Sequence, residues 1–169
     1  MVDTASRQVQ VLILCPTREL AMQSYEEIMK FSKYKKGLRA AAVYGGQQIE
    51  RQFASLKRGV QIVIGTPGRI MDHMRRGTLK LSELQMIVLD EADEMLNMGF
   101  REDIETILKD IPSPRQTVLF SATMPPAIMN ITRQYQNEPV IIEVNRKQRT
   151  LDTIEQYYYE IPLGRKMDA

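Results

Sequence analysis

Met86-Ile87-Val88-Leu89-Asp90-Glu91-Ala92-Asp93 joins four apolar residues directly to a cluster of carboxylates. An apolar run that ends in acidic residues is typical of a buried parallel strand, and open α/β sheets bind ligands at the carboxyl ends of such strands. In nucleoside-triphosphate sites an Asp at this position commonly holds magnesium, and a neighbouring Glu can orient the attacking water. The chain contains no G-x-x-x-x-G-K-[ST] loop to cradle phosphates. The sequence therefore predicts one half of an ATPase site.

The segments on either side of this stretch alternate between strand-like and helix-like patterns. Short β-branched runs are followed by segments with apolar residues at helical spacing, such as Ile49, Phe53 and Leu56. The predicted strands cover residues 9–15, 40–44, 61–64, 86–89, 117–120 and 140–144. Repeated β-α units of this length predict an α/β fold, a parallel sheet flanked by helices on both faces.

Composition limits the possible classes of function. The net charge is only +2, from 23 basic and 21 acidic residues, so nucleic-acid binding has to be argued from local features. The single cysteine, Cys15, excludes an intramolecular disulfide, fits a reducing compartment and is interpreted as a small core hydrophobe. No apolar run approaches the length of a membrane span. We therefore expect a cytoplasmic protein with no membrane partner.

Three basic pairs, each followed by a glycine, mark predicted helix ends: Lys35-Lys36-Gly37, Lys57-Arg58-Gly59 and Arg75-Arg76-Gly77. Glycine supplies a left-handed closing residue, and cations suit the negative end of the helix dipole. RNA contact is the alternative interpretation of these pairs. The structural interpretation accounts for all three positions at once.

Five polar or glycine-rich motifs each follow a predicted strand. In a parallel sheet these motifs share one edge, which makes a functional edge the simplest account of them. They are Pro16-Thr17-Arg18-Glu19-Leu20-Ala21, Gly45-Gly46, Thr66-Pro67-Gly68-Arg69, Asp90-Glu91-Ala92-Asp93 and Ser121-Ala122-Thr123.

Three of these motifs predict a track for a phosphate backbone. Thr17 and Thr66 are candidate helix N-caps, and exposed N–H groups at such helix starts attract phosphates. Arg18 and Arg69 add positive charge beside them. Gly45-Gly46 lets a sugar-phosphate chain approach closely. The alternative is that these residues only build tight turns between strand and helix.

Two short hydroxyls are candidates for coupling to the acidic motif. Ser121 and Thr123 follow the strand predicted at 117–120, where they could hydrogen-bond Asp93 and so report the state of the ATP site. A purely capping role is the alternative. His73, the only histidine, has no Cys or carboxylate at metal-ligand spacing and is interpreted as structural.

In this order and spacing, the five motifs closely resemble those of the DEAD-box ATP-dependent RNA helicases, most of all the bacterial members. The resemblance covers about residues 9–161 and implies a RecA-like fold. It implies that Asp90 coordinates magnesium through water, that Glu91 positions the hydrolytic water, and that Asp93 couples to Ser121 and Thr123. RNA phosphates and sugars would be held by Pro16, Thr17, Arg18, Gly45, Gly46, Thr66, Pro67, Gly68 and Arg69.

The family has two RecA-like domains, with ATP bound between them and single-stranded RNA lying across both. Closure of the two domains bends one strand out of a duplex and so unwinds it locally. By this resemblance, residues 1–144 form a partial first domain, residues 145–152 a linker, and residues 153–169 the start of the second domain. The abrupt start and stop predict a part excised from a longer chain.

The departures from the family pattern bear on activity. The sequence has no phosphate loop, no adenine-recognising Gln motif and no second-domain arginine finger. An arginine finger alone contributes about three to five decades in rate. We expect the complete protein to use ATP and Mg²⁺, and this fragment alone to be inactive.

Two other functions are compatible with the sequence. One is a DNA helicase or translocase with the same fold. The other is a non-enzymatic RNA-binding or partner-docking module that has lost its phosphate loop. An incomplete parallel sheet also leaves an edge strand with unpaired backbone groups, which predicts self-association of the fragment.

Overall fold

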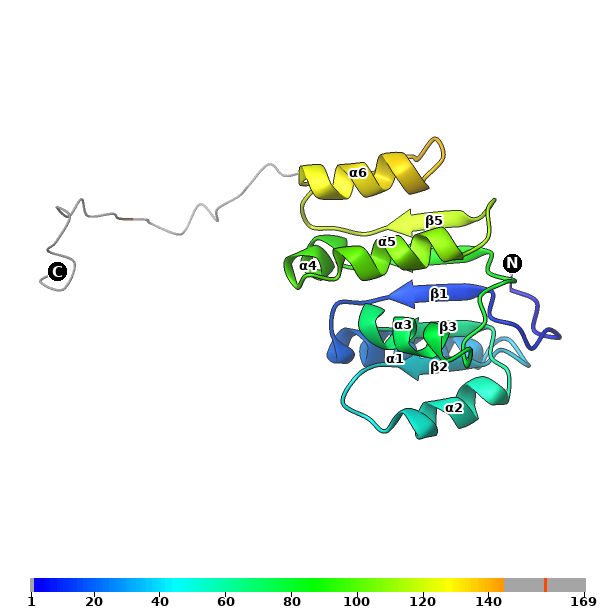
Figure 1. Ribbon diagram of the computed structural model, residues 1–169. Coiled ribbons are helices and arrows are strands. Elements are labelled where there is room, and N and C mark those ends of the chain that lie inside the picture. Colours follow the sequence, from blue (N-terminus) through cyan, green and yellow to red (C-terminus); the bar gives the residue numbers. More distant parts are fainter. Residues whose placement is uncertain (1, 145–156, 158–169) are drawn as a thin grey trace, which may run out of the picture. The chain divides into compact units, whose positions relative to one another are not determined.

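The computed structural model describes residues 2–144 and Tyr157 (Figure 1). The chain divides into two units, Met1–Pro139 and Val140–Ala169, and every helix and strand of the described residues lies in the first. The linker predicted at 145–152 lies outside the described residues. So does the predicted second-domain start at 153–169, apart from Tyr157, which is exposed.

Strands and helices alternate through the first unit. The strands are β1 (Val11–Leu14), β2 (Ala40–Val43), β3 (Ile62–Gly65), β4 (Met86–Leu89) and β5 (Gln116–Leu119). The helices are α1 (Arg18–Ser32), α2 (Ile49–Lys57), α3 (Pro67–Arg75), α4 (Ala92–Asn97), α5 (Arg101–Asp110) and α6 (Pro126–Tyr135).

The five strands form one parallel sheet in the order β2-β3-β1-β4-β5. The pairing is in register, because Leu14 lies opposite both Gly65 and Leu89, Gly65 opposite Val43, and Leu89 opposite Leu119. All five carboxyl ends therefore share one edge of the sheet. The predicted α/β fold with a parallel sheet and flanking helices is confirmed.

The sixth predicted strand, at residues 140–144, is wrong. These residues have no regular secondary structure, and their side chains are exposed. Its β-branched residues favour extended backbone, but a strand also needs a hydrogen-bonded neighbour. The sheet formed by the described residues supplies none for this segment.

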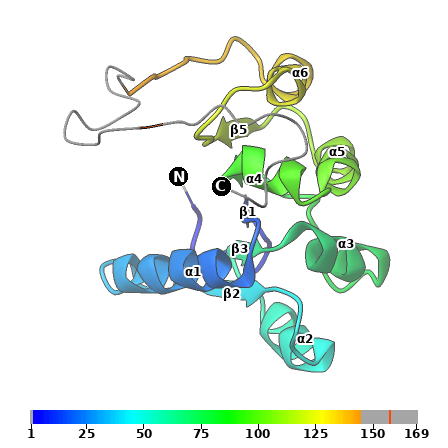
Figure 2. The same ribbon diagram turned by 90° about the vertical axis from the view of Figure 1, so that its left-hand side faces the viewer.

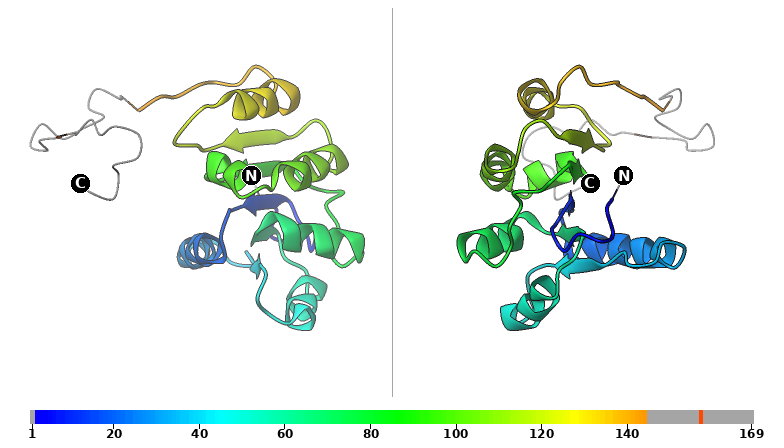
Figure 3. Two further views of the ribbon diagram at one scale, coloured as in Figure 1. Left: turned by 60° about the vertical axis from the view of Figure 1, so that its left-hand side comes forward. Right: turned by 90° about the vertical axis from the view of Figure 1, so that its right-hand side faces the viewer.

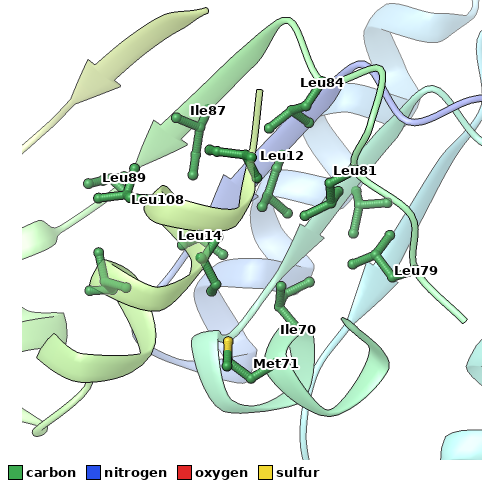
Figure 4. Packing of buried hydrophobic residues seen from close by; sticks show 14 of the residues in the cluster. Leu12, Leu14, Ile70, Met71, Leu79, Leu81, Leu84, Ile87, Leu89 and Leu108 are labelled. Carbon is green, nitrogen blue, oxygen red and sulfur yellow. The ribbon is translucent and has the colours of Figure 1, made fainter. Parts of the chain in front are cut away.

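The two faces of the sheet are covered unequally. Seen end-on, α3 and α5 lie on one side of the sheet and α1 on the other (Figures 2 and 3). Leu12 and Leu14 of β1 and Ile87 and Leu89 of β4 point to the first side and are buried. Together with side chains from α3 and α5 they form the main core (Figure 4). The alternate residues of the same strands, such as Val88, are only half-buried.

Helix ends follow the sequence signals at two of the three basic pairs. After α2 and α3 the chain closes at Gly59 (φ 82°) and Gly77 (φ 66°), which lie directly behind the C-caps Arg58 and Arg76. Helix α1 instead ends at Ser32, before the first pair, and a turn leads to Gly37. Within residues 2–144, no helix has both the length and the apolarity to cross a bilayer.

Cys15 lies directly after β1 and is fully buried. Its Sγ is 3.9 Å from Ser24 Oγ, and its backbone N–H donates to Gly65 O. Burial raises the pKa of the thiol to about 11. The interpretation of Cys15 as a core residue is consistent with this position.

We expect Cys15 to resist thiol-specific reagents while the protein is folded. A rise in pKa from 9.0 to about 11 lowers the thiolate fraction about a hundredfold at pH 8, and the thiolate is the reactive form. Reaction with Ellman's reagent at pH 8 should therefore be slow in buffer and complete within minutes in 6 M guanidinium chloride. Equal rates in both conditions would show that Cys15 is accessible in the folded chain.

Candidate functional site

The residue that follows each strand begins the functional edge of the sheet. Because the strands end in register, Cys15, Tyr44, Thr66, Asp90 and Phe120 stand in one row. All five sequence motifs begin within one or two residues of this row. The edge predicted from the sequence therefore exists, and its contacts form two clusters.

The first cluster begins with Asp90 and Glu91. The Asp90 N–H donates to Leu14 O at 2.9 Å, which fixes the start of the motif against β1, and its side chain is half-buried. Glu91 is exposed and left-handed, with φ 50° and ψ 54°. A residue other than glycine rarely adopts this backbone, and such strain concentrates at functional sites. It turns the chain sharply from β4 into α4.

No cation within residues 2–144 is ion-paired with Asp90 or Glu91. Their carboxylate oxygens are therefore suitable ligands for a divalent cation. Residues 2–144 contain no group of three or more His, Cys, Asp or Glu side chains that would enclose a metal. Magnesium in phosphate-transfer sites is usually held by one or two carboxylates, waters and substrate phosphates. The acidic pair fits that arrangement.

Asp93 joins the acidic motif to the segment after β5. Its Oδ2 accepts hydrogen bonds from Thr123 N at 2.9 Å and Thr123 Oγ1 at 2.7 Å. Its own N–H donates to Ser121 Oγ at 3.2 Å, and Ser121 Oγ donates to Thr123 O at 2.7 Å. The structure thus brings together the three residues that the sequence predicted to interact.

The hydrogen bonds determine the ionisation of Asp93. Burial acts to raise the pKa of Asp93, but hydrogen bonding with Thr123 and Ser121 outweighs it and holds the pKa below the ordinary value of 3.8. The carboxylate is therefore ionised at neutral pH. Its stabilising contribution is present above about pH 3.8 and is lost as the pH falls through the lower pKa of the folded state.

A hollow of about 340 Å³ opens beside Asp90 on the half-covered face of the sheet. Apolar side chains of β1, β4 and α1 line it, including Ile13, Val88 and Ile28. Phe120, whose side chain is 58% exposed, lies at the same hollow. Asp90 thus adjoins a largely apolar surface that the described residues leave open.

The second cluster contains the predicted backbone-binding motifs. Thr17 caps α1, since its Oγ1 accepts from Leu20 N at 3.3 Å, whereas Pro16 is buried. Arg18 is exposed, and its guanidinium carbon lies 5.2 Å from the centre of the Tyr44 ring. This distance is that of a cation–π contact.

The loop after β2 and the start of α3 complete this cluster. Gly45 and Gly46 are exposed, and Gly46 has a φ of 80°, which a residue with a side chain rarely adopts. Thr66 occupies the N-cap of α3 without a side-chain capping bond, and Pro67 is buried in the first turn. Gly68 is exposed beside them. The first turn of α3 therefore offers backbone N–H groups to an anion.

The Arg69 side chain is held by hydrogen bonds to other residues. Its Nη1 and Nη2 donate to Gln47 O at 3.1 and 3.2 Å, and Nη1 also donates to Gln52 Oε1 at 3.3 Å. Sequence reasoning did not identify Gln52, a buried residue of α2. A signal existed, because Gln52 lies on the same face of the predicted helix as Ile49 and Leu56, where an apolar residue is expected.

His73 is fully buried and hydrogen-bonded, with Nε2 2.9 Å from Gln52 Oε1 and Nδ1 2.8 Å from Thr78 Oγ1. Burial and the charge of Arg69 lower the pKa of His73. These contacts agree with the structural role inferred from the sequence.

We expect Thr123→Val to raise the pKa of Asp93 toward its ordinary value. The substitution keeps the size of the side chain and removes the hydroxyl that donates to Oδ2. It should also lower the free energy of unfolding at pH 7 by about 1 kcal/mol, the net contribution of one hydrogen bond. Carboxyl-carbon NMR titration and urea unfolding measure the two effects.

Thr106→Val is the matched control, because the Thr106 hydroxyl bonds only to Glu102 O of its own helix. It should leave the titration of Asp93 unchanged. An unchanged Asp93 pKa in Thr123→Val would show that the hydroxyl does not stabilise the carboxylate.

Comparison with known proteins identifies relatives of this chain. The chain is 53% identical over 168 residues to the ATP-dependent RNA helicase CshA of Listeria monocytogenes, covering 99% of this chain and 32% of that protein. It is 50% identical over 167 residues to the DEAD-box ATP-dependent RNA helicase CshA of Geobacillus kaustophilus, covering 99% of this chain and 36% of the relative. The chain thus spans about a third of the length of these relatives.

Two solved structures of DEAD-box proteins have a similar fold. A DEAD box protein from the hyperthermophile Methanococcus jannaschii superposes with a TM-score of 0.77 and 46% identity, covering 82% of this chain and 37% of that one. The yeast DEAD-box splicing factor Prp28 gives a TM-score of 0.72 and 35% identity, covering 75% of this chain and 30% of that one. Residues 1–131 match the family model described as DEAD/DEAH box helicase, so the chain belongs to the DEAD/DEAH box helicase family.

Proposed function

We propose that these residues are part of an ATP-dependent RNA helicase and supply the acidic half of its ATPase site and part of its RNA track. The observation that carries the proposal is the hydrogen-bonded cluster of Asp93, Ser121 and Thr123 directly beside Asp90 and Glu91. This cluster connects the acidic motif behind β4, which is suited to phosphate chemistry, to the residues behind β5 of the same sheet. The names of the relatives support the same activity.

Each acidic residue has a distinct proposed role. Asp90 would hold Mg²⁺ through water, and Glu91, exposed at the turn into α4, would orient and polarise the attacking water. The bound ion would neutralise charge on the transferred phosphate. Asp93 Oδ2 already accepts two hydrogen bonds from Thr123, and Asp93 is therefore assigned to coupling rather than to the metal.

The proposed RNA track uses the remaining motifs. Phosphates would lie at the exposed starts of α1 and α3 and along Gly45-Gly46, with Arg18 supplying charge. Such contacts are independent of base sequence, and the 2′-hydroxyl distinguishes RNA from DNA.

The proposal requires partners beyond these residues. A second RecA-like domain would complete the ATP site and the RNA track. A cytoplasmic location stays a prediction, as does self-association of this chain through an exposed edge of the sheet, whose edge strands among residues 2–144 are β2 and β5.

We expect Glu91→Gln in the complete protein to reduce RNA-stimulated ATP hydrolysis at least about a hundredfold, the contribution typical of a general base. The steady-state rate of phosphate release with saturating RNA measures the effect. Glu94→Gln, at an exposed carboxylate of the following helix α4, is the control and should keep normal turnover.

Three results of this experiment would contradict parts of the proposal. Undiminished hydrolysis in Glu91→Gln would refute the role of Glu91. Equal stimulation by DNA would favour the DNA translocase. Absence of turnover in a folded complete protein would favour a non-enzymatic binding module.

We expect residues 1–169 alone not to bind Mg-ATP tightly, because the sequence holds no phosphate loop. Titration calorimetry should show no saturable heat at ATP concentrations up to about a hundred micromolar. The complete protein, measured in the same buffer, is the control. A micromolar dissociation constant for residues 1–169 would show that the acidic edge binds nucleotide without the loop.

A further inference from the structure

Tyr44 lies at the centre of the contacts between three of the motifs. It directly follows β2, and its side chain is only 4% exposed. The guanidinium of Arg18 lies over its ring, and Gln47 Nε2 donates to its hydroxyl at 2.7 Å. Its backbone carbonyl accepts from Gln52 Nε2 at 2.9 Å. The residue before Gly45-Gly46 is thus held on three sides by other side chains.

Gln52 connects Tyr44 to α3. Its Nε2 donates to Tyr44 O, while its Oε1 accepts from Arg69 Nη1 at 3.3 Å and lies 2.9 Å from His73 Nε2. The amide orientation follows from chemistry, because a backbone carbonyl only accepts and a guanidinium only donates. The His73 ring is itself held by Thr78 and by an edge-to-face contact with Phe53, whose ring centroid is 5.5 Å away.

Arg69 links α3 to the loop after β2. Both terminal nitrogens donate to Gln47 O, so the guanidinium spans from α3 to the loop that carries Gly45-Gly46. The orientation of the Arg69 guanidinium also depends on Gln52, because Gln52 Oε1 accepts from the same Nη1. One buried amide therefore contacts both sides of the gap between this loop and the start of α3.

We propose that Gln52 is a positioning residue for polynucleotide binding. It fixes the loop after β2 at a set distance from the first turn of α3, so that Gly45-Gly46 and Thr66–Arg69 present one continuous backbone track. The inference rests on the proposed RNA-binding function. Gln52 itself is 4% exposed, so it acts through Tyr44 and Arg69 rather than by contact with RNA.

The geometry separates this role from a merely structural one. Gln52 donates to Tyr44 O, directly before a loop whose residues 45–48 are all exposed, and its Oε1 accepts from Arg69 at the start of α3. Without the amide, Tyr44 O and the Arg69 guanidinium lose a common partner and the two segments can separate. The expected consequence is weaker RNA binding in a chain that still folds and still hydrolyses ATP.

The test is Gln52→Met in the complete protein, because Met keeps similar volume and removes both polar ends. The probe is fluorescein-labelled fifteen-residue oligouridine. We expect the RNA concentration that half-saturates binding, and the one that half-stimulates ATP hydrolysis, to rise about tenfold. Hydrolysis at saturating RNA should stay within about twofold of normal. Gln85→Met is the control, since Gln85 is exposed and directly precedes β4, at the edge of the sheet opposite the motifs.

The outcomes separate this inference from the proposed function. Failure of the unaltered protein to bind the oligonucleotide would overturn the proposed function and this inference together. Normal RNA binding by Gln52→Met, or a loss of maximal hydrolysis with unchanged half-stimulation, would overturn only the inference. If Gln52→Met does not fold, Gln52→Glu replaces it. That variant keeps the oxygen facing Arg69 but loses the donor to Tyr44 O, so it should also weaken binding, and unchanged binding would again refute the role.

Discussion

The in-register pairing of five parallel strands is the constraint on which the other features depend. Leu14 of β1 lies opposite Gly65 on one side and Leu89 on the other, so the strands end level. The level ends put Tyr44, Thr66 and Asp90 in one row, although up to 46 positions separate them in sequence. A shift of one residue in any pair would turn that strand's core residues to the opposite face. The burial of Leu12, Leu14, Ile87 and Leu89 on one side therefore fixes the register and, with it, the functional edge.

Much of this arrangement could be predicted from the sequence because strand ends and turn residues are local signals. The link between Asp93 and Ser121 and Thr123 followed from the position of two hydroxyls behind one strand and an acid behind another. The network around Gln52 could not be predicted, because the partner of a buried amide depends on the distance between helices rather than on spacing along the chain. The sequence predicted that Arg69 binds phosphate. In the structure Arg69 also contacts Gln47 and Gln52, so it belongs to the Gln52 network as well. The strand expected at residues 140–144 failed for a related reason, since composition favours extended backbone but cannot supply a neighbouring strand.

Strain and hydrogen bonding act together in the turn after β4. Glu91 adopts a left-handed backbone that costs about 1–3 kcal/mol at a residue with a side chain. The turn is held on both sides, because Asp90 N donates to Leu14 O and Ala92 N donates to Phe120 O. Asp93, two residues further on, adds three hydrogen bonds to Ser121 and Thr123. The strained residue is thus the exposed one, and the hydrogen bonds of its neighbours hold the backbone of the turn in place.

The strand order divides the edge into two halves. The acidic cluster lies behind β4 and β5, whereas Tyr44, Gln52 and Arg69 lie behind β2 and β3. β1 stands between them, and its last residues bond to both sides, since Leu14 O accepts from Asp90 N and Cys15 N donates to Gly65 O. Arg18 follows the same strand and reaches Tyr44. Any movement of the acidic turn relative to the backbone track must therefore pass through the end of β1 and the start of α1. Because Cys15 there is fully buried and its backbone is bonded to β3, the two halves are expected to respond together rather than independently.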